Sequence, residues 1–267
     1  MSLRTSHHRT KRRFPAVVAI CLSIGFAARA DTPASAPAPA TSATAAPAAS
    51  GLPPIQAAPA PPQAPAVPWE KIDDDDGIAV YRREVPGSPI IAFKGEGVIN
   101  ASILRVASIL VDSTRATEWV ESLVEARTLR HVSEIEYIEY DHVGTPFVMK
   151  DRDFVLDCKL DLDPASKKAT LRCHSVTDAL APPTSYVRGE LISSGFALTA
   201  LEHGAKTHIV AEVHCDPKGS VAKWIVNWFQ KSWPHSTIMR LRAQAAKPDV
   251  VDHPRLKQVL TEKGYFN

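Results

Sequence analysis

The stretch from Phe154 to Ser175 alternates between apolar and polar residues on both sides of one turn, as a β-hairpin with one buried face does. The first arm places on one face Phe154, Leu156, Cys158, Leu160 and Leu162. After the turn Asp163–Lys168, the same face continues with Ala169, Leu171, Cys173 and Ser175. A loop centred between Ala165 and Ser166 pairs positions whose numbers sum to 331, so we expect Cys158 opposite Cys173 and Leu160 opposite Leu171. The hairpin therefore predicts an antiparallel sheet with an apolar inner face.

Further elements are expected on both sides of this hairpin. Strand patterns cover Gly77–Val85, Ile90–Ile99, Glu134–Val143, Tyr186–Ile192, Phe196–Leu201 and Lys206–Cys215. Apolar residues at helical spacing predict two helices between residues 100 and 123, one capped by Asn100 and one by Ser113. A last helix, Val221–Ala246, contains Pro234. This order predicts a single α+β domain in which a curved sheet grips the long C-terminal helix.

The first 68 residues differ in composition from the rest of the chain. Residues 1–30 have a basic start, an apolar run of about 15 residues from Phe14 to Ala28, and a small-x-small pattern that ends at Ala30, which is typical of a secretory signal peptide. Residues 31–68 hold 25 Ala or Pro among 38 and predict a disordered linker. We therefore expect a domain of residues 69–267 that is periplasmic or secreted, in a bacterial envelope, after cleavage near Ala30.

The charge of the expected domain argues against nucleic-acid binding. Residues 1–68 hold six of the 31 Lys and Arg residues and one of the 29 Asp and Glu residues. The remaining 25 basic and 28 acidic residues give the domain a net charge of about −3. Proteins that bind the phosphate backbone carry a basic excess on the folded domain, so we expect no nucleic-acid partner.

Four segments, in order and at matching spacing, resemble the START (steroidogenic acute regulatory protein-related lipid transfer) domain family, nearest its phosphatidylcholine-transfer branch. They are Gly77–Tyr81, Pro146–Val155 with its Arg-Asp-Phe-Val core, Tyr186–Glu190 followed by Gly195-Phe196, and Ala222–Trp228. The resemblance implies a helix-grip fold with a tunnel for one lipid. It also implies that the Thr177–Ser185 loop, with Leu180, Pro182 and Pro183, acts as a lid. Some sterol-binding members carry an arginine where this chain has Cys158, so the resemblance implies a more apolar wall here.

A lipid tunnel needs a closed apolar wall and one or two polar groups that orient the ligand. The expected wall consists of Leu156, Cys158, Leu171, Cys173, Val213, Ile225 and Trp228. Glu139 and Tyr137, which share a face of the Glu134–Val143 strand, are the candidate polar groups. The alternative is that this face meets solvent and that Ile138 and Tyr140 point inward.

Other polar clusters have simpler explanations than chemistry. Arg152 and Asp153 suit a structural ion pair at a sheet edge, and His208, Glu212 and His214 suit a solvent-exposed strand face. The acidic run Asp73–Asp76 lacks the spacing of a calcium loop and suits a solvated turn.

The three cysteines of the expected domain and two tryptophans of its last helix are assigned to the interior. Cys158 and Cys173 are expected as buried thiols, with a disulfide as the alternative, and Cys215 as a free inward thiol. Trp224 and Trp228 are expected to pack on the sheet, whereas Trp233 is the candidate for touching lipid headgroups.

The sequence predicts a monomer without catalytic residues, metal or other cofactor that binds one lipid and makes transient contact with membranes. Two alternatives stay open: a cyclase or aromatase-like enzyme that uses the same cavity with Glu139 and Tyr137, and a lipid sensor that does not transfer its ligand.

Overall fold

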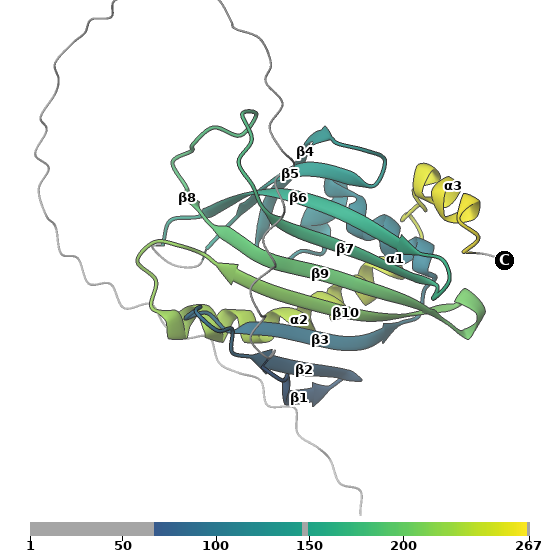
Figure 1. Ribbon diagram of the computed structural model, residues 1–267, viewed down its shortest axis with the longest axis horizontal. Helices are drawn as coiled ribbons and strands as arrows, with labels where there is room; N and C mark the ends of the chain where they lie inside the picture. The colour runs from purple at the N-terminus through teal and green to yellow at the C-terminus, as the bar shows by residue number, and fades with distance from the viewer. Residues whose placement is uncertain (1–66, 146–148, 266–267) are drawn as a thin grey trace, which may run out of the picture. The chain divides into compact units, whose positions relative to one another are not determined.

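A curved antiparallel sheet is the frame of the domain in the computed structural model, which describes residues 67–145 and 149–265 (Figure 1). Its strands are β1 (Glu70–Asp75), β2 (Ile78–Arg83), β3 (Ala92–Ile99), β4 (Leu123–His131), β5 (Glu136–Val143), β6 (Arg152–Asp163), β7 (Lys168–Ser175), β8 (Val187–Arg188), β9 (Glu190–Leu201) and β10 (Lys206–Asp216). The spatial order is β1-β2-β3-β10-β9-β7-β6-β5-β4, and β8 pairs in parallel with β6. The expected leader and all but the last two residues of the expected linker lie outside the described residues.

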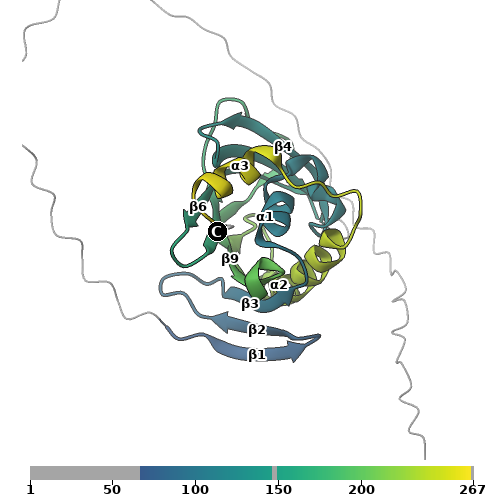
Figure 2. The same ribbon diagram turned by 90° about the vertical axis from the view of Figure 1, so that its right-hand side faces the viewer.

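Three α-helices accompany the sheet within these residues: α1 (Ile103–Val111), α2 (Lys223–Ala245) and α3 (Pro254–Glu262). Turned by 90°, the sheet curls around α1, while α2 lies along the strands β2, β3 and β10 (Figure 2). The described part of the chain contains no helix that is both long and apolar enough to span a membrane. The fold is α+β, and the expected curved sheet with a long C-terminal helix is confirmed.

The hairpin of β6 and β7 has the register that the sequence predicts. Cys158 faces Cys173, Leu160 faces Leu171, and Leu156 faces Ser175. The turn centre fixes this register because a shift by one residue would turn every apolar side chain of the hairpin to the other face.

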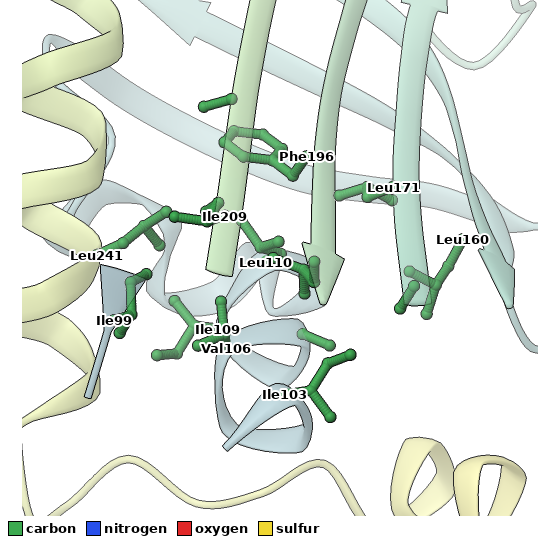
Figure 3. Close-up of a cluster of buried hydrophobic side chains, with 14 of the residues drawn as sticks. Ile99, Ile103, Val106, Ile109, Leu110, Leu160, Leu171, Phe196, Ile209 and Leu241 are labelled. Carbon is green, nitrogen blue, oxygen red and sulfur yellow. The ribbon is translucent and has the colours of Figure 1, made fainter. Parts of the chain in front are cut away.

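The apolar core is densest around α1. Val106, Ile109 and Leu110 of this helix point at Ile209 and at the strands beside it (Figure 3). The helix has apolar residues at helical spacing, and Ser102 caps its N-terminus by accepting a hydrogen bond from the Arg105 N–H. Ser102 therefore takes the capping role that the sequence assigned to Asn100. Full burial of such side chains stabilises the fold by about 1.5–3 kcal/mol each.

Two glycines of β3 let α2 approach the sheet closely. A Cβ at Gly95 would lie 2.8 Å from the Cβ of Pro234, closer than carbon atoms pack. A Cβ at Gly97 would lie 3.4 Å from the Arg242 guanidinium of α2 and 3.2 Å from Ile78 of β2. Pro234 is buried inside α2, so the residue expected to kink the helix is also the point where the helix sits on the strand.

Three sequence expectations about the elements are wrong. The second helix, expected from Ser113, is a short 3₁₀ turn (Ser113–Glu118) capped by Asp112, because Leu123 already belongs to β4. The acidic run Asp73–Asp76 lies mostly in the exposed edge strand β1, which pairs with β2. The strands expected at 186–192 and 196–201 are largely one continuous strand, β9. Helix α3 was not predicted from the sequence.

Candidate functional site

The inner face of the sheet is tightly filled at one end and accessible at the other. Along β10, Ile209 and Ala211 have no accessible surface, Val213 has 6%, and Cys215 is half-buried. Along β7, the same change runs from buried Ala169 and Leu171 to half-buried Cys173 and Ser175. The side chains of α1 fill the first end. Toward the other end, the inward side chains are only half-buried.

The expected wall residues of the strands lie on one face of the sheet, as predicted. Leu156, Cys158, Leu171 and Val213 are buried, and their strand partners place them on one common face. Cys173 belongs to the same face and is half-buried. Ile225 is half-buried near the start of α2, and the side chain of Trp228 lies outside the described residues.

Tyr137, Glu139 and Asp141 extend this face on β5. They stand opposite Cys158, Leu156 and Phe154 of β6, and directly opposed residues of a sheet point to the same side. Tyr137 belongs to the main apolar core, whereas Ile138 and Tyr140 pack in a separate cluster on the outer face. The face that carries Glu139 and Tyr137 is therefore the inward one. Asp141, which the sequence reading missed, joins them there.

Glu139 and Asp141 form a carboxyl pair without a counter-charge. Burial is the main cause that raises the pKa of Glu139 to about 9, and the neighbouring Asp141 raises it further. Burial likewise raises the pKa of Asp141 to about 7, and raises that of the Tyr137 phenol. Within the described residues, neither carboxyl forms an ion pair with Lys, Arg or His. The Oδ1 atom of Asp141 is buried without a hydrogen-bond partner.

The loop Thr177–Ser185 does not lie over the inner face. Its Ala181 is buried against Ile138, Tyr140 and Val155, on the outer face of β5 and β6. Leu180, Pro182 and Pro183 are exposed there. The lid that the sequence assigned to these residues is therefore placed on the wrong side of the sheet.

Cys158 and Cys173 form a disulfide, with Cα atoms 4.2 Å apart. The expectation of two buried thiols is corrected, and the alternative holds because the predicted register brings the two residues face to face. Cys215 is free, as expected, and burial raises the pKa of its thiol to about 12. At neutral pH this thiol is protonated and unreactive.

Arg152 and Asp153 are structural, but they are not each other's partners. Asp153 is fully buried, and Arg188 donates to its two oxygens at 2.9 and 3.0 Å, while the Thr184 hydroxyl donates at 2.8 Å. Burial acts to raise the pKa of Asp153, yet these hydrogen bonds hold it below its usual range. Arg152 instead donates to the carbonyls of Lys150 and Pro217. The motif therefore ties β6 to β8 and to the turn before α2.

Two tryptophans have the opposite burial from that expected. Trp233 is half-buried and packs on the core, with its ring 6.0 Å from that of Phe196. Trp224, in the first turn of α2, is 72% exposed. Because Pro234 seats α2 on β3, the neighbouring Trp233 turns toward the sheet, and Trp224 is left at the surface.

The outer polar residues have mostly structural partners. Glu212 pairs with Arg83 at 3.2 Å, and His214, expected at the surface, is buried with its Nε2 atom 3.0 Å from the Ser88 hydroxyl oxygen. Asp75, Asp76 and His235 offer possible metal-ligand atoms within 4.8 Å of one another on the described surface. The two aspartates are exposed, and His235 pairs with Asp76.

Comparison with known families matches residues 62–244 to the START domain. An uncharacterized protein of Pseudomonas aeruginosa is 24% identical over 181 residues, which cover 67% of this chain and 87% of that protein.

Solved structures with the same fold include human StAR-related lipid transfer protein 5, at a TM-score of 0.61 and 18% identity, covering 72% of this chain and 87% of the other. A STAR-related lipid transfer protein fragment from Xanthomonas axonopodis has a TM-score of 0.59 and 24% identity, covering 67% and 99%. Human STARD10 has a TM-score of 0.62 and 18% identity, covering 73% and 77%.

Proposed function

The chain belongs to the START domain family, and from that premise we propose that it binds one hydrophobic lipid inside the domain and carries it between membranes of the cell envelope. The observation that carries the proposal is the inner face of the sheet. It is apolar along β6, β7, β9 and β10, and it stays accessible at the end away from α1. The relatives named as lipid transfer proteins have the same fold and support this assignment.

The physical requirement on such a site is burial of the acyl chain. Each CH₂ group exposed to water costs about 0.8 kcal/mol, so a 16-carbon chain costs about 13 kcal/mol. Leu156, Phe196 and Val213 can replace that burial, since each presents an apolar side chain to the inner face. The carboxyl pair on β5 supplies the polar groups for the ligand head.

An oxidising compartment is supported by two independent features. The N-terminal sequence has the basic, apolar and small-residue regions of a secretory signal. Disulfides persist mainly outside the reducing cytosol, and Cys158 and Cys173 form one. Mass determination of the protein recovered from its native envelope should give a chain that begins near Asp31. A chain recovered from the cytosol with Met1 intact would contradict this location.

Binding is tested by filling the inner face. Val213→Trp adds a large ring to the inner face of β10, whereas Val210→Trp adds the same ring to the outer face of the same strand. The full-length protein is incubated with membrane lipid extract and analysed by native mass spectrometry. We expect one lipid adduct on the wild type and on Val210→Trp, and none on Val213→Trp. Empty wild-type protein in every lipid extract would overturn the proposal.

Transfer requires contact with membranes, and Trp224 is the exposed aromatic residue best placed for it. A tryptophan at the surface buries its ring at the level of lipid headgroups. In a vesicle-to-vesicle assay, Trp224→Ala should slow transfer several-fold and leave the lipid adduct intact. Wild-type protein that binds lipid but moves none between vesicles would identify a sensor.

We also propose a monomer, because the described chain alone supplies the sheet and the helices that cover it. Sedimentation that shows a dimer would contradict this.

One observation favours an enzymatic alternative. The raised pKa values of Glu139 and Asp141 allow a protonated carboxyl and an ionised one to coexist inside the domain, as general acid–base catalysis requires. A cyclase or aromatase-like activity would convert an aromatic polyketide and lose turnover in Glu139→Gln. Lipid binding without any turnover favours the carrier.

A further inference from the structure

The carboxyl pair on β5 is a half-buried acidic site, and no ion pair neutralises it within the described residues. Glu139 stands opposite Thr128 of β4 and Leu156 of β6, and Asp141 stands opposite Ala126 and Phe154. The titratable group on the same face of β5 is Tyr137. The residues directly opposite the pair thus contribute apolar groups and one hydroxyl, and that hydroxyl, of Thr128, lies 3.1 Å from the Ser113 hydroxyl oxygen. Two basic residues lie further along this face. Arg152 of β6 stands opposite Val143 and donates to the carbonyls of Lys150 and Pro217, and the exposed His131 of β4 stands opposite Tyr137.

Unpartnered polar atoms show that the interior lacks hydrogen-bond partners. Asp141 Oδ1 is buried without a partner, and so is the indole nitrogen of Trp119, a residue that is only 6% exposed. Trp119 belongs to the same core cluster as Tyr137 and Leu156, the neighbours of Glu139. A buried polar group without a partner is unfavourable, and such groups in native proteins commonly mark a place for a ligand or an ordered water.

Aromatic rings stand beside the pair. Tyr137 lies two residues before Glu139 on the same face, and Phe154, whose ring packs over Gly189, stands opposite Asp141. A cation above an aromatic face is attracted by the negative ring centre, and a carboxylate beside that ring adds a hydrogen-bond acceptor. Acidic oxygens flanked by aromatic rings favour a positively charged nitrogen over a phosphate or a carboxylate.

We propose that the lipid carries a protonated amine, which seats on Glu139 and Asp141 beside Tyr137. This inference rests on the proposed function, since it assigns a chemical class to the head of the ligand held in the same site. The ammonium N–H groups donate to the carboxylate oxygens, including the orphan Oδ1 of Asp141, and the acyl chain follows the apolar face toward Val213.

Proton release follows from this arrangement. Without ligand, the pair holds a proton at neutral pH because burial disfavours its charge. An ammonium supplies the missing positive charge, so the pair ionises and the proton leaves to solvent as the amine binds. Affinity for an amine should therefore increase as the pH rises, by up to about tenfold per pH unit for each proton released.

The test compares chain-matched probes on the full-length protein. Dodecylamine, dodecanol and dodecanoic acid displace a fluorescent fatty probe at pH 5.5, 6.5 and 7.5. We expect dodecylamine to bind more tightly at each higher pH, dodecanol to show a flat profile, and dodecanoic acid to bind most weakly at pH 7.5. In Glu139→Gln/Asp141→Asn, the amine should lose its advantage and its pH dependence while dodecanol still binds. Asp157→Asn, on the outer face of β6, is the matched control.

The outcomes separate the two proposals. If none of the three probes binds the wild type, the proposed lipid-binding function fails together with this inference. If dodecanol binds and dodecylamine is no tighter at any pH, only the inference fails. Tightest binding of dodecanoic acid at pH 7.5 would also overturn it. The wild-type pH series decides the matter even if the double variant does not fold.

Discussion

The buried pair of Glu139 and Asp141 makes a specific prediction about stability and pH. In the unfolded chain both carboxyls ionise near pH 4, whereas burial raises both pKa values in the folded domain. At pH values between about 4 and the raised pKa values, the folded state holds protons that the unfolded state has released. Stability from this pair is therefore greatest at acidic pH and is lost as the pH rises toward the folded pKa values.

The magnitude follows from the number of protons. Each proton held only by the folded state lowers the free energy of unfolding by about 1.4 kcal/mol per pH unit. The partial exposure of Glu139 reduces this effect. Between pH 5 and 7, the pair should therefore lower the free energy of unfolding by roughly 2–4 kcal/mol. Glu139→Gln/Asp141→Asn keeps the shape of both side chains and removes both protons from this balance.

Urea denaturation of the full-length protein at pH 5, 6 and 7 measures the effect. The wild type should lose more stability than the double variant over this range, whatever the absolute stability of each. Asp157→Asn, which changes a carboxylate on the outer face of the adjacent strand, should keep the wild-type slope. Equal slopes for the wild type and the double variant would refute the claim that the pair is buried and protonated.

Three further changes test other parts of the structure. Asp153→Ala should destabilise the domain by roughly 3 kcal/mol in urea denaturation, because it leaves a guanidinium and a hydroxyl without their buried acceptor; a loss below 0.5 kcal/mol would contradict that role. Replacement of Cys158 and Cys173 together by Ala should lower stability by about 3 kcal/mol, as expected for a closed loop of 15 residues, and an equal melting temperature with and without reductant would argue against the disulfide. Trp233→Ala should cost about 2–3 kcal/mol and Trp224→Ala less than 0.5 kcal/mol, since only the first packs on the core; the reverse order in thermal melts would show that α2 is rotated.

The sheet was predictable wherever local signals agreed. In the hairpin of β6 and β7, the turn centre and the alternation of apolar residues give the same register, and the structure has that register. The sequence left the inward face of β5 open, and the register with β6 decides it, because apolar Cys158 and Leu156 stand opposite Tyr137 and Glu139. The same register reveals Asp141, which stands opposite Phe154 on that face. A carboxylate in a strand ordinarily indicates a solvent-exposed position, so Asp141 was not considered as an inward residue.

Features that depend on contacts between distant segments were not predictable. Pro234 of α2 packs against Gly95, and Trp224 and Trp233 have the opposite burial from what the sequence suggested. The Thr177–Ser185 loop packs on the outer face through Ala181, a contact with β5 and β6 that no local pattern indicates. The edge strand β1 was missed because its acidic residues lack apolar alternation. It is held by pairing with β2 and by Ile72, which packs against the core.

A crystal structure of the full-length protein purified together with its natural ligand tests most directly whether the domain encloses a lipid. The account predicts continuous density for one acyl chain along Leu156 and Val213, with the head of the ligand against Glu139 and Asp141. Side chains or ordered water that fill this end of the domain, with no density for an acyl chain, would contradict it.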